Sequence, residues 1–416
     1  MNESSCDVAI VGGGIIGLSC ALYLREAGHD VVVVERNDPA SGASRGNAGA
    51  LAFAEILPLA SPRILRKAVR WLFDPLGPLS LPPAYLPQIA PWLLRLWRAS
   101  WPARYQANIH AQVALIGLAQ EEMLPMLART GLAHHLHTEG VLEVYEGADR
   151  FAAAQETARQ RLAYGIESHV VQGDALAELQ PGLAPRFTHG MLVPRWRNVG
   201  DPQALAVDIG LRAQALGARL LRREVLAVEP ATQGGRLRLD DGSTLQARRV
   251  VIAAGAFSHR LSQPLGDPIP LETERGYNTT LPPDALDLRR QITFADHGFV
   301  ISPLRCGIRV GGAVELAGLK RPPDYRRAQA MLDKAKTFFP ALRTEGGEQW
   351  MGFRPSLPDS LPVIGRARHH RDIFYAFGHG HLGLTQSAAT ARLIRDLVGG
   401  QAPAIDLAPY RAERFF

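Results

Sequence analysis

The alternation of apolar and polar positions at the start of the chain predicts a β–α–β unit. Residues 7–35 read DVAIVGGGIIGLSCALYLREAGHDVVVVE. The apolar run at Val8–Ile10 predicts a buried strand, and the glycine-rich turn after it predicts the link to an amphipathic helix that ends at Gly28. A second apolar run predicts another strand, which closes at the acid Glu35.

The glycine turn of this unit predicts a dinucleotide site. Gly12, Gly14 and Gly17 fit the pattern GxGxxG, in which the glycines allow a tight turn, close approach to a pyrophosphate and close packing of helix on strand. The helix N-terminus offers free N–H groups and a favourable dipole to the phosphates. Glu35 is placed to accept hydrogen bonds from a ribose diol, and an acid there makes NADP the poorest candidate. An ordinary glycine-rich turn is the alternative.

Later segments indicate that this first domain is discontinuous. The turn-rich stretch Ser41–Gly49 interrupts the unit at once, whereas a nicotinamide enzyme normally completes a contiguous doubly wound sheet. Residues 218–261 predict a strand, a hairpin and the apolar strand Val250–Ala254. Gly352–Gly365 and Phe377–Val398 add another glycine-rich turn that leads into a helix.

The composition is that of a large globular protein. The 416 residues suggest one large or two interleaved domains, and 46% hydrophobic with 21% charged residues excludes a disordered chain. A net charge of +6 is mild for this length, so no nucleic-acid partner is expected. Cys6, Cys20 and Cys306 show no CxxC spacing, which argues against a disulfide framework or a zinc site.

The remaining composition signals favour a cytoplasmic protein without a metal. The opening MNESSC carries no cation and does not read as a signal peptide. No stretch reaches the roughly 18 apolar residues that a membrane span needs. The histidine clusters His134–His137 and His369–His370 have no carboxylates at ligand spacing, so we expect them to be solvent-exposed.

A basic, tryptophan-rich insert at residues 56–105 holds the local charge excess. It contains one acid, Asp74, four of the six tryptophans and seven cations. These residues are Trp71, Trp92, Trp97, Trp101, Arg63, Arg66, Lys67, Arg70, Arg95, Arg98 and Arg104. Cations beside tryptophans are typical of a helix lying on anionic lipid, at the inner face of the cell membrane. The alternative is a helical hairpin that packs its tryptophans into the substrate domain while its arginines reach water.

Five motifs follow one another along the chain in a characteristic order. They are GGGIIG with Glu35, SGASRGNAG, AAGAFS, GFRP with LPDSLPVIG, and GHGHLGLT. This ordered set resembles the FAD-dependent amino-acid oxidase and dehydrogenase family over essentially the whole chain. Within the family the sequence is most similar to bacterial D-amino-acid dehydrogenases, including those that act on D-proline or hydroxy-D-proline.

The resemblance implies an α/β fold in which a Rossmann-like FAD-binding domain is interleaved with an α+β substrate domain built on a mixed sheet. The FAD-binding domain would comprise residues 1–55, 195–262 and 345–416, and the substrate domain residues 56–194 and 263–344 with the insert at 56–105. The substrate would lie between the two domains, beside the flavin ring.

The resemblance also carries cofactor contacts over to this sequence. The ADP portion would be held by Gly12, Gly14, Ile15, Ile16, Gly17, Glu35, Arg36 and, at the adenine, Val225. The flavin portion would be held by Ser44, Arg45, Asn47, Ala48, Gly49, Ala254, Gly255, Gly380, His381, Leu382, Gly383, Leu384 and Thr385. Covalent members carry a cysteine in the C-terminal element, and residues 350–365 have none, so the FAD is expected to be non-covalent.

Arg354, in Gly-Phe-Arg-Pro, matches the arginine that grips the substrate carboxylate in this family. A planar guanidinium binds a carboxylate through two parallel charge-assisted bonds, which fix both position and orientation. A surface arginine is the alternative interpretation.

For the other polar candidates the sequence leaves more than one role open. Tyr277, His379 and His381 are candidate partners of the substrate amine or the flavin, with a core tyrosine and backbone-bonded turn histidines as alternatives. Arg305 and Arg309 are expected to be solvent-exposed, with a second carboxylate clamp as the alternative, and Cys306 is expected to be buried.

These observations predict an FAD-dependent D-amino-acid dehydrogenase. Hydride would leave the substrate α carbon for flavin N5 from a neutral amine, and no strong base is compulsory. Electrons would pass to a membrane quinone if the insert contacts lipid. A glycine or sarcosine-type oxidase that uses oxygen, and a flavin-binding subunit without catalysis, remain open.

Overall fold

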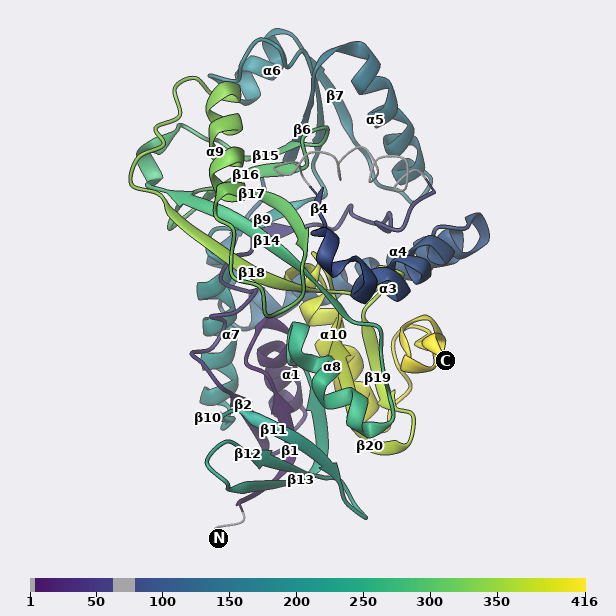
Figure 1. Cartoon of the computed structure of the whole chain (residues 1–416). Coiled ribbons are helices and arrows are strands. Elements are labelled where there is room, and N and C mark those ends of the chain that lie inside the picture. Colours follow the sequence, from purple (N-terminus) through teal and green to yellow (C-terminus); the bar gives the residue numbers. More distant parts are fainter. Residues whose placement is uncertain (1–3, 63–78) are drawn as a thin grey trace.

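The computed structural model describes residues 4–62 and 79–416, and Figure 1 shows its two sheets one above the other. Of the basic insert, Arg63, Arg66, Lys67, Arg70 and Trp71 lie outside the described residues. The chain crosses between the two sheets repeatedly, as the separated motifs predicted. The α/β fold class is confirmed.

The first sheet contains the predicted β–α–β unit. Its strands are β1 (Ser4–Val11), β2 (Val31–Glu35), β10 (Arg219–Arg222), β11 (Val225–Pro230), β12 (Gly235–Leu239), β13 (Thr244–Ile252), β19 (Val363–Ala367) and β20 (His370–Phe377). β10, β2, β1, β13 and β20 run parallel, and an antiparallel ribbon of β12 and β11 continues from β13. Residues of β1 are buried on both faces, Val8 and Ile10 on one and Ala9 and Val11 on the other, as a parallel strand requires.

Helices from distant parts of the chain cover one face of this sheet. α1 (Ile15–Glu26) packs against α7 (Pro202–Ala215) and α10 (Gly383–Val398), and α10 packs in turn against α4 (Pro102–Arg129). The apolar side chains of these helices and of β1 form one continuous core. The short helix α8 (Ser258–Ser262) follows β13 and contacts β11.

The second sheet is mixed, as the family resemblance implied. Its strands are β4 (Leu79–Ser80), β6 (Val141–Tyr145), β7 (His169–Gln172), β8 (His189–Val193), β14 (Glu272–Leu281), β15 (Gln291–Phe294), β16 (Phe299–Leu304), β17 (Gly307–Leu316) and β18 (Glu348–Ser356). The helix α9 (Arg326–Phe338) packs against β14 and β17 over a core of aromatic residues. α5 (Gly147–Leu162) and α6 (Asp174–Leu179) flank the far strands, and β3 (Ala50–Leu51), β5 (Leu136–His137) and β9 (Arg197–Val199) form a small third sheet.

Two elements lie across the domain boundaries that the sequence predicted. β18 falls in the segment assigned to the FAD-binding domain, yet it pairs with β14 of the second sheet. α4 falls in the segment assigned to the substrate domain, yet it packs against α10 of the first. The domain boundaries stay a prediction. β18 and α4 each pack against an element of the other predicted domain.

The described part of the insert forms the helix α3 (Leu86–Ala99) and the start of α4. Ile89 and Trp92 are buried against Leu316, which fits the helical-hairpin interpretation. Trp97 and Trp101 are each 44% exposed, with their rings in edge contact at 5.2 Å, which fits the surface interpretation. Among the described residues, none of the helices is both long and apolar enough to cross a membrane.

Candidate active site

A cavity of about 1090 Å³ runs from the nucleotide turn of the first sheet to the second sheet. Of the predicted site residues, Gly12, Gly14, Ile15, Ile16, Glu35, Arg36, Ser44, Asn47, Ala48, Val225, Ala254, Gly255, Tyr277, Arg354, His379, Gly380, His381, Leu382, Gly383 and Leu384 line it. Residues as far apart in the chain as Gly12 and Leu384 therefore line one cavity.

Four predicted cofactor residues do not line the cavity and instead support its walls. Gly17 allows α1 to approach the turn, since a Cβ there would lie 1.9 Å from the Gly12 carbonyl oxygen. The Thr385 hydroxyl accepts a hydrogen bond from the Ala52 amide at 2.9 Å. Arg45 pairs with Glu348 at an exposed position, and Gly49 hydrogen-bonds to the segment around Val199.

The nucleotide end has the features that a pyrophosphate and a ribose need. Gly12 has a φ of +111°, and a Cβ there would come within 2.5 Å of the Ala253 carbonyl oxygen. Gly14 caps α1 without a side chain, and the first amide of the helix, that of Ile15, donates to Ser44 Oγ at 3.1 Å, so the loop that lines the cavity is bonded to the helix start. The Glu35 carboxylate accepts hydrogen bonds from the amides of Gly13 at 2.6 Å and Asn37 at 3.0 Å, which holds it at the end of β2.

Two side chains of the second sheet, Arg309 and Asn278, hydrogen-bond to the loop Ser41–Gly49. The sequence did not indicate Asn278 as a site residue, and it predicted that Arg309 is solvent-exposed. Arg309 donates to the carbonyl oxygens of Arg45 at 3.0 Å and Asn47 at 2.5 Å. The Asn278 amide donates to the Gly46 carbonyl at 3.1 Å. Arg309 is only 7% exposed, so the prediction that it is solvent-exposed is wrong, and its burial lowers the pKa of the guanidinium.

Two other sequence interpretations are also corrected. Cys306 is exposed at a turn after β16, where the apolar environment that we expected is missing. His135 is 1% exposed and its Nε2 lies 2.7 Å from an Asp208 carboxylate oxygen, so this histidine is not solvent-exposed. Ring nitrogens of His134 and His135 and a carboxylate oxygen of Asp208 lie within 4.8 Å of one another, so the fold brings to this cluster a carboxylate that the sequence spacing did not show.

The flavin end is built on a second helix start. α10 begins after Leu382, which provides no capping side chain, and no acid occupies the first turn. Gly380 has a φ of +53° and its amide donates to the Pro355 carbonyl oxygen at 2.7 Å, which binds this turn to β18. Two helix starts that face one elongated cavity, with glycines at close approach, fit a dinucleotide with a flavin at the far end.

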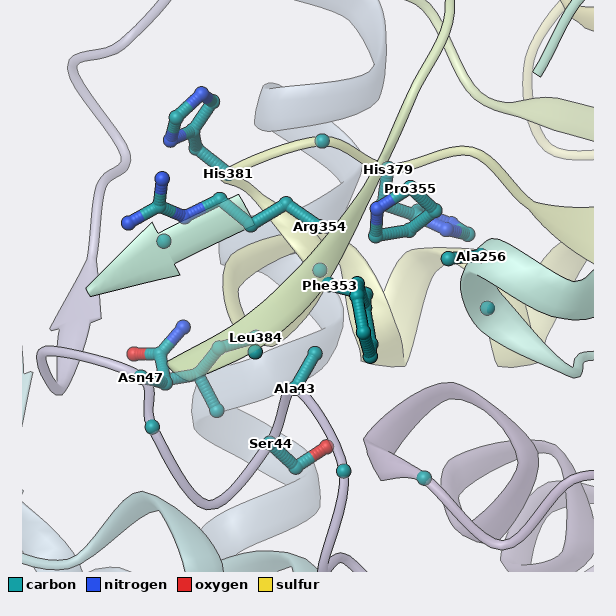
Figure 2. Close-up of a pocket in the computed structure, with 18 of the residues that line it drawn as sticks. Ala43, Ser44, Asn47, Ala256, Phe353, Arg354, Pro355, His379, His381 and Leu384 are labelled. Carbon is teal, nitrogen blue, oxygen red and sulfur yellow. The ribbon is translucent and has the colours of Figure 1, made fainter. Parts of the chain in front are cut away.

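Arg354 extends from β18 over a patch without side chains on the second sheet (Figure 2). A Cβ at Gly276 would lie 2.4 Å from its Cζ. Its Nη2 donates to the Gly312 carbonyl oxygen at 3.0 Å and its Nη1 to the Ala313 carbonyl at 3.4 Å. Desolvation by the cavity wall lowers the pKa of this half-buried guanidinium, while the charge of Glu274 opposes the change.

Glu274 and His381 complete this end of the cavity. The Glu274 carboxylate is 7% exposed and accepts hydrogen bonds from Ser356 Oγ at 2.7 Å and His381 Nε2 at 2.6 Å. Burial raises the pKa of Glu274, but the charge and hydrogen bond of His381, the hydrogen bond of Ser356 and the charge of Arg354 outweigh this and hold the pKa at about 2. His381 and Arg354 both line the cavity, and Figure 2 labels both in the same part of it.

Tyr277 and His379, the other two catalytic candidates, are turned away from Arg354. Tyr277 follows Gly276 on β14, so its side chain lies on the opposite face of the sheet and its hydroxyl donates to Glu315 at 2.6 Å. Burial raises the pKa of Tyr277 to about 12. His379 Nε2 lies 2.9 Å from Thr390 Oγ1 on α10, and burial lowers the pKa of this histidine to about 3. Both residues line the cavity, but their polar atoms bond to Glu315 and Thr390, so a role at the substrate amine or flavin stays a prediction that these contacts do not favour.

The two-sheet fold and the elongated cavity fit a flavin-binding oxidoreductase, with the Arg354 guanidinium lining the end of the cavity on the second sheet. The family model described as DAO, FAD dependent oxidoreductase, matches residues 7–397, and this chain belongs to that family. FAD is accordingly its cofactor, and it is an oxidoreductase.

Individual relatives agree over the whole length of the chain. A D-amino-acid oxidase of Bradyrhizobium diazoefficiens is 34% identical over 415 residues, which cover 98% of each chain. A D-amino acid dehydrogenase of Rhizobium johnstonii is 32% identical and covers 96% of this chain and 97% of its own. Glycine oxidase from Geobacillus kaustophilus superposes with a TM-score of 0.75 at 25% identity, covering 99% of both chains.

Proposed function

We propose that this protein is an FAD-dependent D-amino-acid dehydrogenase. The observation that carries the proposal is the Arg354 guanidinium at the flavin end of the cavity. Among the described residues it bonds only to main-chain carbonyls and forms no ion pair. Its other N–H groups remain available for the two oxygens of a substrate carboxylate. The relatives at 29–34% identity are named D-amino-acid oxidase or D-amino acid dehydrogenase, which supports a substrate of D configuration.

FAD, when bound, supplies the acceptor for a hydride from the substrate α carbon. The residues proposed to hold it are the predicted cofactor residues that line the cavity, together with the loop that Arg309 and Asn278 anchor. The chain contributes position: Arg354 fixes the carboxylate, and the bare surface at Gly276 and Gly312 leaves room beside it. The product imine would hydrolyse to a keto acid and ammonia, or stay cyclic if the substrate is D-proline or hydroxy-D-proline.

An anaerobic screen tests this proposal. Purified holoenzyme is mixed with single D- and L-amino acids, including D-proline, and the visible flavin band is followed. We expect D-amino acids to bleach the band and their L enantiomers to leave it. No bleaching by any amino acid would support the non-catalytic flavin subunit, and bleaching by glycine or sarcosine alone would support the oxidase alternative.

The proposed electron acceptor is a membrane quinone, on the strength of the exposed surface of α3. Trp97, Trp101 and Leu94 are 44%, 44% and 56% exposed on or just after this helix. Arg98 and Arg104 lie beside them and form no ion pair within the described residues, so this surface complements anionic lipid. We expect the protein to sediment with anionic vesicles at low salt, to leave them at high salt and to ignore zwitterionic ones.

The same preparation separates the dehydrogenase from an oxygen-using oxidase. A dehydrogenase turns over with a soluble quinone analogue and accumulates little hydrogen peroxide in air. Stoichiometric peroxide, with no stimulation by the quinone, would refute the quinone acceptor without affecting the amino-acid substrate.

A further inference from the structure

His381 and Glu274 form a hydrogen-bonded pair at the cavity wall. Binding of a substrate carboxylate by Arg354 does not require this pair. The pair joins the turn before α10 to β14, with His381 Nε2 2.6 Å from a Glu274 carboxylate oxygen. Ser356 Oγ occupies the other oxygen of Glu274 at 2.7 Å. Both carboxylate oxygens of Glu274 therefore have a hydrogen-bond partner. Among the described residues the carboxylate forms no ion pair with Arg354, which is opposite it in the β14–β18 register.

This arrangement decides which nitrogen of His381 carries a proton. One oxygen of the Glu274 carboxylate already accepts from Ser356 Oγ and the other faces His381 Nε2; a carboxylate only accepts hydrogen bonds, so Nε2 is the donor in this pair. A neutral imidazole then keeps its lone pair on Nδ1. Within residues 4–62 and 79–416, Nδ1 forms no hydrogen bond, and the side chain is 36% exposed while it lines the cavity.

We propose that His381 is the base that takes the proton from the substrate ammonium, with Glu274 as the positioning residue that orients it. This inference rests on the proposed function and deepens it, since hydride can leave the α carbon only after the amine has become neutral. One N–H bond of the ammonium breaks, an Nδ1–H bond forms, and the positive charge moves from the substrate to the imidazole. His381 and Arg354 both line the cavity and both act electrostatically on Glu274, so they belong to the same end of it, and Figure 2 labels both there.

The charges around His381 are compatible with this transfer. Arg354 is a cation on the same wall, and a bound substrate carboxylate offsets it. Glu274 lies in contact and stabilises an imidazolium. Glu55 also lines the cavity, where desolvation raises its pKa and the charges of Arg161 and His381 act against that increase. A proton on Nδ1 therefore lies beside acidic groups as well as beside Arg354.

The kinetic test compares His381→Gln with a matched control. His297, outside the cavity lining, pairs with Glu146 at 2.8 Å in the same Nε2-to-carboxylate geometry, so His297→Gln removes an equivalent pair away from the site. We expect His381→Gln to slow anaerobic flavin reduction by about 100-fold at pH 7 and to recover as the pH approaches the substrate amine's own pKa. The rate of flavin reduction in Glu274→Gln should lie between the rates of His381→Gln and the parent. The rate in His297→Gln should match that of the parent.

A binding test avoids turnover. 2-Aminoisobutyrate has an ammonium and a carboxylate but no α hydrogen, and isobutyrate lacks the amine. In the parent, protonation of His381 at low pH should weaken the binding of 2-aminoisobutyrate relative to isobutyrate. In His381→Gln this difference in pH dependence should vanish. Flavin content and thermal unfolding monitor folding, and His381→Asn serves as a second variant if His381→Gln does not fold.

The outcomes separate this inference from the proposed function. If the parent is reduced by D-amino acids and the folded His381 variants keep the parent's pH profiles in both tests, the pair only ties the turn to β14 and the inference is overturned alone. If no amino acid reduces the parent and 2-aminoisobutyrate does not bind, both the function and the inference fall.

Discussion

Gly276→Ala is the sharpest perturbation of the carboxylate site. The new Cβ would lie 2.4 Å from Cζ and Nη2 of Arg354 and 2.8 Å from Nη1, and real Cβ contacts do not come below 3.0 Å. The guanidinium must therefore leave the carbonyl oxygens of Gly312 and Ala313 that hold it. The side chain is long enough to move, so we expect overpacking to cost stability only at the low end of about 1–3 kcal/mol.

The larger effect is expected on ligand binding. A hydrogen bond to a charged group contributes about 1.5–3 kcal/mol, so a displaced Arg354 should weaken carboxylate binding by roughly 10- to 150-fold. The assay is the Kd of isobutyrate, read from the perturbation of the flavin spectrum, with the flavin content measured in parallel. Gly117→Ala in α4 is the matched control, because a Cβ there has nothing within 4 Å. An unchanged Kd in Gly276→Ala would refute the placement of the substrate carboxylate over Gly276.

Three other predictions use the same protein. Arg354→Lys, which replaces a planar fork by a point charge, should raise KM for D-amino acids by about tenfold or more with flavin content unchanged, as measured by steady-state kinetics. Tyr277→Phe should leave flavin reduction unchanged but lower the free energy of unfolding by about 1–3 kcal/mol in chemical denaturation, because buried Glu315 loses a donor. The Glu274 pKa is lowered from 4.5 to about 2 by folding, so its contribution is present above pH 4.5 and lost as the pH falls toward 2. Thermal unfolding of Glu274→Gln should therefore depend less on pH in that interval than unfolding of the parent, and parallel curves would contradict this.

The alternation of side chains along β14 explains how the residues of this site are arranged. In the stretch Glu274-Arg-Gly-Tyr277 the sequence points to the tyrosine as the candidate site residue. Because side chains alternate along a strand, Glu274 and Gly276 share one face of β14 and Tyr277 lies on the other. Recognising this stretch as a strand would have paired the carboxylate and the glycine, and separated the tyrosine from them.

Arg309 and His379 could not be placed by any local signal. Arg309 is buried because the loop Ser41–Gly49, more than 260 residues earlier, presents two carbonyl oxygens to it. His379 faces Thr390 because the turn before α10 is pinned to β18. Each side chain's environment is supplied by a segment distant in the sequence, so composition and spacing around the residue carry no information about it.

The sequence by itself determined the nucleotide half of this protein. The strand, the glycine turn, the helix and Glu35 form a local unit whose hydrophobic period, turn chemistry and helix start all lie within 35 residues, and the ordered motifs implied the flavin. Only the tertiary structure decided the substrate half. There β18 leaves the expected domain to pair with β14, and that long-range pairing brings Arg354, Glu274 and His381 together at one end of the cavity. Pairing between distant strands depends on the packing of the whole chain, which no local pattern encodes.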